Sequence, residues 1–160
     1  MSVDYFLKIP GADGDSADSG YKNAIDVLAW SWGMTQSGSM HIAGGGGSGK
    51  VSVHDLSVTK YLDKASTVIM QKCASGKHFT EAELICRKAG DTPMDYYKVK
   101  MKEVLISSIS SGGSSGEDRV TENVTFNFAK MEVEYTPQNA DGSAGASATL
   151  GWDIRSNVEM

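Results

Sequence analysis

The sequence contains little proline, cysteine or histidine, with three, two and three copies in 160 residues. The two cysteines, Cys73 and Cys86, are too few for a disulfide framework. Together with the scattered histidines they also lack the spacing of a zinc site. A disulfide between them is geometrically possible. We expect two free, half-buried thiols instead, because no secretory signal is recognisable in the chain.

Long apolar runs and basic runs are missing as well. No stretch approaches the roughly 20 apolar residues of a membrane helix, so we expect no membrane insertion. The first residues lack a basic lead and an apolar core, so no signal peptide is expected. A net charge of −5 without any basic cluster argues against nucleic-acid binding. A chain of this length is expected to form one domain, residues 1–160, with a substantial core.

The chain does contain strong two-residue alternation. In residues 124–135, apolar side chains occupy even positions up to Phe128 and odd positions from Met131 onward. A strand can change phase in this way only where one residue falls out of step. We therefore predict a β-bulge or sharp bend at Ala129 and Lys130, between Phe128 and Met131.

Similar changes of phase occur within residues 25–32, 51–58 and 97–106. They predict long, bent strands over residues 25–34, 51–61, 96–109 and 120–135, each serving two parts of one sheet. The alternative is that each segment consists of two short strands joined by a kink. Further strands are expected at residues 3–9, 81–88 and 149–155. The predicted fold is mainly β: a β-barrel of two curved antiparallel sheets with bulged long strands and one flanking α-helix.

The flanking helix is predicted after residue 65. Ser66 can cap its N-terminus, and Gly76 suits the left-handed position that follows a helix. An apolar stripe between them would dock the helix on the sheet, and it comprises Val68, Ile69, Met70 and Cys73.

The candidate catalytic and cofactor-binding motifs are incomplete, because the residues around them do not match what each site requires. Residues 44–50, GGGGSGK, match the first part of a phosphate-binding loop, but Val51 replaces the hydroxyl residue and opens a strand rather than a helix. The acidic loop at residues 10–20 lacks the glutamate of a calcium loop. Glu132 and Glu134 share one strand face and are best interpreted as solvated charges. We therefore expect no cofactor, no metal site and no enzymatic activity.

Ser31 lies between Trp30 and Trp32. If the two tryptophans point into the core, Ser31 points to the opposite face of the strand. It is either an ordinary exposed serine or a position on a smooth wall on which a partner docks.

Several segments, in order and with their spacing, resemble the haemolysin-coregulated protein (Hcp) family. They are residues 26–34 (DVLAWSWGM), 49–66 (GKVSVHDLSVTKYLDKAS), 74–78 (ASGKH), 87–90 (RKAG), 104–108 (VLISS), 112–119 (GGSSGEDR), 121–124 (TENV) and 128–130 (FAK). The resemblance extends from residue 3 to the end of the chain.

This resemblance implies a structural tube protein of bacterial type VI secretion, without catalysis. Members form homohexameric rings that stack into a tube, carry effectors in the ring lumen, and act with a contractile sheath and spike or baseplate proteins. The protein would be assembled in the bacterial cytoplasm and secreted by the machine itself. For this chain, the resemblance places Ser31 on the lumen wall. It makes the loop at residues 37–49 a candidate for ring stacking, with Ser39, His41, Gly44, Gly45, Gly46 and Gly47.

Two other functions remain possible from the residues alone. One is a monomeric β-barrel that binds a small apolar ligand, as lipocalins do. Its interior would need room, whereas three tryptophans and several other large side chains favour a filled core. The other is a nucleotide hydrolase, which would depend on the incomplete phosphate-loop motif.

Overall fold

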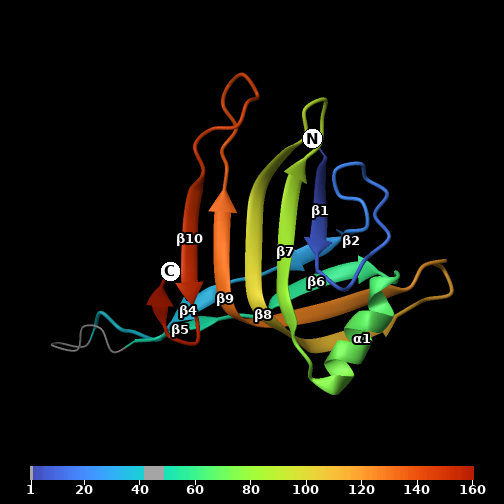
Figure 1. The fold of residues 1–160 in the computed structure, drawn as a ribbon, viewed down its shortest axis with the longest axis horizontal. Helices are drawn as coiled ribbons and strands as arrows, with labels where there is room; N and C mark the ends of the chain where they lie inside the picture. The colour runs from blue at the N-terminus through green and yellow to red at the C-terminus, as the bar shows by residue number, and fades with distance from the viewer. Residues whose placement is uncertain (1, 42–48) are drawn as a thin grey trace.

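The computed structural model describes residues 2–41 and 49–160. The fold is mainly antiparallel β with one short helix, as predicted (Figure 1). The strands are β1 (Val3–Lys8), β2 (Ile25–Val27), β3 (Ala29–Ser31), β4 (Met34–Gln36), β5 (Val51–Val53), β6 (Leu56–Tyr61), β7 (Phe79–Lys88), β8 (Met94–Gly112), β9 (Thr121–Tyr135), β10 (Ala148–Asp153) and β11 (Val158–Glu159). The helix α1 (Ala65–Ser75) follows β6.

Two long strands, β8 and β9, organise the main sheet. Its strand order is β11-β10-β9-β8-β7-β1-β2, and β6 joins it through β9 and carries β3 on its other side. The first part of β9 pairs with β6, and the last part pairs with β10. In Figure 1 both long strands run upright beside β7 and β10 and then bend into the lower part of the molecule, near α1. These two strands therefore serve two parts of one sheet, as their length predicted.

The other two predicted long strands are interrupted. The segment 25–34 forms β2 and β3 and reaches only the start of β4, and the segment 51–61 forms β5 and β6. In both segments, therefore, the alternative of short strands joined by a kink is correct. The hairpin of β4 and β5 is a separate two-stranded sheet.

The barrel is not closed by a continuous ladder. β2 and β3 are separated by Leu28, whose side chain is 45% exposed and whose N–H donates to the carbonyl of Thr59 at 2.8 Å. Within residues 2–41 and 49–160, no ladder pairs β2 with β6. The chain itself crosses from one part of the sheet to the other at this point, so the predicted barrel is an open one.

A β-bulge or a sharp bend was predicted between Phe128 and Met131; the bulge is wrong, and the two strands turn together there instead. β8 and β9 keep one register on both sides of this point, with Lys102 opposite Lys130 and Val104 opposite Phe128. Both strands change phase together, and Glu103 on β8 adopts a left-handed φ of 54°. Because the two strands turn at the same place, neither gains a residue over the other. The register shift lies further along β8, between Ile106 and Ser108.

The core lies between the two parts of the sheet and under α1. Its fully buried side chains come from most strands and from the helix, and they include Leu7, Ile25, Val58, Ile69, Leu84, Val99, Met101 and Phe126. Trp30 and Trp32 pack against this cluster from one edge, as predicted. The barrel interior is thus filled with side chains.

The two ends of α1 differ from each other in how well they were predicted. Ser66 is not the cap, because the helix begins at Ala65 and Ser66 is buried within its first turn. Instead, the carboxylate of Asp63 accepts the Ala65 N–H at 3.0 Å. The C-terminal prediction is confirmed, since Gly76 follows the helix with a left-handed φ of 69°. Cys73 and Cys86 are both free thiols, also as predicted, but only Cys73 is half-buried, whereas Cys86 is fully buried.

Candidate functional surface

Ser31 lies on the exposed face of β3. It sits directly opposite Ser57 of β6, while the neighbouring Trp30 turns toward the core. The alternation around Ser31 therefore assigned its side chain to the correct face. Directly opposed residues of an antiparallel ladder share a face, so the surroundings of Ser31 follow from the register of its neighbours.

A small, uncharged surface spreads from Ser31 across four strands. Ser57 lies opposite Thr125 on β9, and Thr125 lies opposite Ser108 on β8. Parallel to this row, Thr59 lies opposite Asn123. We call this face the polar wall, comprising Ser31, Ser57, Thr59, Ser107, Ser108, Ser110, Asn123, Thr125 and Asn127.

Five side chains of the polar wall, Thr59, Ser107, Ser108, Asn123 and Thr125, are hydrogen-bonded among themselves. The Thr59 hydroxyl donates to the Asn123 amide oxygen at 2.8 Å. The Thr125 hydroxyl lies 2.7 Å from that of Ser107 and 2.6 Å from that of Ser108. These contacts restrain five of the short side chains, and the wall offers hydroxyl and amide groups without long side chains.

Asp55 brings a carboxylate to the edge of the polar wall. It precedes β6 and accepts hydrogen bonds from the Ser107 hydroxyl at 2.6 Å and the Asn127 amide at 2.8 Å. Both oxygens of this carboxylate therefore have partners from neighbouring strands, which ties the start of β6 to β8 and β9.

The upper part of the same sheet carries charges instead. Lys100 lies opposite Glu83 on one side and Glu132 on the other, and Lys98 lies opposite Glu134. Opposite charges placed across strands stabilise the pairing modestly. This arrangement supports the interpretation of Glu132 and Glu134 as solvated charges rather than catalytic groups.

The remaining sequence candidates lie away from the nine-stranded sheet or outside the described residues. Ser39 and His41 follow β4 and are exposed, and the Ser39 hydroxyl accepts the His41 N–H at 3.2 Å. The β4–β5 hairpin extends to one side of the molecule in Figure 1. Gly44, Gly45, Gly46 and Gly47 lie outside the described residues. The phosphate-loop motif ends at β5, a strand, as expected.

The acidic loop after β1 is bound to the sheet by Arg87. Asp18 pairs with Arg87 at 2.6 Å and Asp4 pairs with it at 2.9 Å. The guanidinium also lies over the rings of Phe6 and Tyr21. Its hydrogen bonds lower the pKa of Asp18 to about 2. Within the described residues, no group of three or more His, Cys, Asp or Glu side chains is placed to hold a metal ion.

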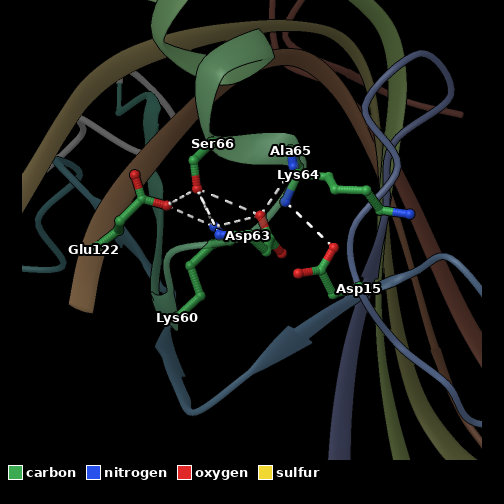
Figure 2. Close-up of polar contacts among 7 residues, drawn as sticks. All are labelled: Asp15, Lys60, Asp63, Lys64, Ala65, Ser66 and Glu122. Carbon is green, nitrogen blue, oxygen red and sulfur yellow. Dashed lines mark hydrogen bonds and ion pairs between the residues drawn. The ribbon is translucent and has the colours of Figure 1, made fainter. Parts of the chain in front are cut away.

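A buried ion pair was not anticipated from the sequence. Lys60 of β6 faces Glu122 of β9 beneath α1, with 2.6 Å between Nζ and Oε1 (Figure 2). A signal was present, because each residue continues the even-numbered apolar series of its strand. Lys60 follows Leu56 and Val58, and Glu122 precedes the apolar residues of β9. When oppositely charged residues occupy core-facing positions of two strands, they indicate a buried ion pair.

Comparison with known proteins gives a consistent result. The family described as type VI secretion system effector, Hcp, matches residues 6–135. The chain belongs to the Hcp family. It is 56% identical to Protein hcp1 of Pseudomonas aeruginosa, over 99% of both chains.

Solved structures of Hcp proteins share this fold. Hcp1 from Salmonella typhimurium matches with a TM-score of 0.83 and 38% identity over the whole of both chains. A structure described as a type six secretion system protein matches with a TM-score of 0.91 and 29% identity, over 99% of this chain and 100% of that one. A type VI secretion system effector from Yersinia pestis matches at 0.78 and 32%, over 94% and 100%. The sequence resemblance to the Hcp family is therefore confirmed. Among residues 2–41 and 49–160, no helix is long and apolar enough to cross a membrane.

Proposed function

We propose that this Hcp protein is a structural subunit of the type VI secretion tube. Six copies form a ring, rings stack into a tube, and effectors travel in the lumen against the polar wall. The observation that carries this proposal is the polar wall itself, a smooth hydroxyl- and amide-lined face on a four-stranded part of the sheet. The role is one of assembly and transport, without catalysis or a cofactor.

The edges of this four-stranded part support a ring. In the described part of the chain, β3 pairs only with β6, and β8 has no partner besides β9 beyond Val104. Unpaired strand edges are templates for pairing with another chain. Successive strands β3, β6, β9 and β8 are antiparallel, so β8 of one copy can meet β3 of the next in the same antiparallel sense. Such head-to-tail contacts close into a ring when the rotation allows it.

The tube role also assigns the partners. We propose that stacked rings lie inside a contractile sheath and meet spike or baseplate proteins at one end, and that neither nucleic acid nor membrane insertion is involved. The protein would be assembled in the bacterial cytoplasm and leave the cell through the secretion machine. For stacking we propose the loop at residues 37–49, of which Ser39 and His41 are described.

The test is the native mass together with negative-stain images of the purified protein. We expect particles of six times the 17.0 kDa chain mass, with an open centre. A monomer would contradict the ring and favour the small-ligand barrel. That alternative is weakened by the filled interior, where Val58, Met101 and Phe126 are fully buried. The nucleotide hydrolase is weakened by the strand that follows the glycine-rich motif.

A further inference from the structure

The buried charges of Lys60 and Glu122 lie directly behind the polar wall. Both side chains are 0% exposed. The Lys60 ammonium donates hydrogen bonds to Glu122 at 2.6 Å and Ser66 at 3.1 Å, and it lies 2.9 Å from the Asp63 carboxylate as an ion pair (Figure 2). The Ser66 hydroxyl also donates to the same Glu122 oxygen. The cluster thus joins β6 and β9 to the first turn of α1.

Apolar alternation alone cannot fix how β6 aligns with β9. A shift by one residue would expose the core face, but a shift by two returns the same faces to the same sides. On the core side, Leu56 and Val58 lie opposite Phe126 and Val124. In a register shifted by two residues, Leu56 would lie opposite Phe128 or Val124 and would still meet an apolar side chain. The apolar series is interrupted only where Lys60 or Glu122 would come to lie opposite a valine.

The ion pair distinguishes these registers. Lys60 pairs with Glu122 in the observed register. A shift by two residues would place Lys60 opposite Val120 or Val124, and each charge would lose its partner across the ladder. Buried charges without compensation are strongly unfavourable, whereas a buried pair is often replaceable by apolar residues without loss of stability.

We propose that the buried Lys60–Glu122 pair selects the register of β6 against β9, and so aligns the polar wall on the opposite face. Thr59 and Asn123, the wall pair that shares a 2.8 Å hydrogen bond, are the immediate neighbours of Lys60 and Glu122. Register selection is the best attested use of buried polar groups. The proposal concerns pairing within one chain, so it stands or falls independently of ring and tube formation.

The test measures the register of β6 against β9 by disulfide formation between pairs of introduced cysteines. In a Cys73→Ser, Cys86→Ala background, Thr59→Cys with Asn123→Cys reports the observed register by disulfide formation. Thr59→Cys with Thr125→Cys, or with Thr121→Cys, reports a shift by two residues. Strand neighbours lie within disulfide range, and residues displaced by two positions lie beyond it.

The decisive variant replaces the pair by apolar residues, Lys60→Met with Glu122→Leu. We expect the displaced cross-links to rise by about tenfold or more relative to the in-register one, because the penalty on displaced registers is gone. A matched control, Asp55→Ala with Asn127→Ala, removes a polar pair of the same register at the solvent-facing side. Its cross-link ratio should stay as in the parent. In the parent chain, water would satisfy the exposed Asp55 and Asn127 side chains in a displaced register, so their pairing places little penalty on that register.

An unchanged ratio in the folded Met/Leu variant would overturn the proposal. If that variant does not fold, Lys60→Gln with Glu122→Gln supplies a second measurement, because it removes both charges while keeping size and hydrogen-bonding groups. We expect a smaller rise of the displaced cross-links there. The same ratio as in the parent chain would count against register selection by charge.

Discussion

Ser31 and Ser57 lie directly opposite each other on the exposed face of β3 and β6, and the row continues through Thr125 to Ser108. Four short hydroxyl side chains in line make a face without protrusions. In the proposed ring this face forms part of the lumen wall, which effectors would contact. The size of the side chains along this row is therefore the property to test first.

Ser31→Gln should impair effector retention and leave ring formation intact. Glutamine adds a long side chain to the row, whereas the core packing of Trp30 lies on the other face of the strand. The measurement is co-purification of an effector that is retained by the parent rings, with native mass as the readout of assembly. Ser115→Gln, in an exposed loop, is the control and should retain the effector. If Ser31→Gln retained the effector as well as the parent protein does, the proposed contact between effectors and the polar wall would be wrong.

The loop between β4 and β5 can be shortened without disturbing its base. Ser37 and Lys50 are joined by hydrogen bonds of 2.9 and 3.2 Å, and the backbones of Gly38 and Gly49 approach so closely that a side chain on Gly49 would clash. An Asn-Gly turn in place of residues 39–48 therefore matches the hairpin geometry. We expect this variant to form rings but few or short tubes, as counted by negative-stain microscopy. Tubes of the parent length would show that stacking does not depend on this loop.

Lys60→Met alone should strongly destabilise the protein. It leaves the buried Glu122 carboxylate with Ser66 but without its cation. Breaking a buried pair from one side typically costs about 3–5 kcal/mol. Urea unfolding should show this loss as a lower midpoint. Adding Glu122→Leu should recover most of it, since the second change removes the uncompensated charge. A loss as large in the double variant as in the single one would mean that packing around Lys60, rather than its charge, supports the fold.

The strands and their faces could be predicted from the sequence because side-chain alternation is a local property. Residues 120–135 and 96–109 correspond closely to β9 and β8, and Ser31 was assigned to the correct face. The bulge was misplaced because a phase change in one strand does not reveal what its partner does. Here the partner turns at the same point, through Glu103.

The polar wall could not be assembled from the sequence, because its residues come from four strands whose pairing is not local. Thr59 and Asn123 are 64 residues apart in the chain and share a hydrogen bond. The Lys60–Glu122 pair is a different case, since both residues continue an apolar series in their strands. That pair could have been identified from the sequence, because its two opposite charges occupy core-facing positions of their strands.

Cys86 should be inert toward thiol reagents in the folded protein. Burial raises the pKa of its thiol to about 12. The thiolate is the reactive form, so almost none is present near neutral pH. A colorimetric thiol assay on native protein should therefore detect at most one rapidly reacting thiol, from the half-buried Cys73, and two after denaturation. A Cys73→Ser variant that still reacts rapidly when folded would contradict this.

Acid should weaken the attachment of the loop after β1 through Asp18. The guanidinium of Arg87 donates hydrogen bonds to the Asp18 carboxylate at 2.6 and 2.9 Å and lowers its pKa from 3.8 to about 2. A carboxyl whose pKa is lower in the folded state than in the unfolded state binds protons preferentially when unfolded. Its contribution to stability is therefore complete above the unfolded value, and it is lost as the pH falls from about 4 to about 2.

The Asp18→Asn variant isolates this contribution, because an amide does not titrate in this range. We expect its free energy of unfolding to fall less steeply than that of the parent protein between pH 4 and pH 2, and to be lower than the parent value at pH 7. Asp13→Asn, at an exposed position of the same loop, is the matched control and should follow the parent curve. If the parent and Asp18→Asn curves were parallel throughout this range, the Arg87 contact would contribute nothing to the acid sensitivity of the fold.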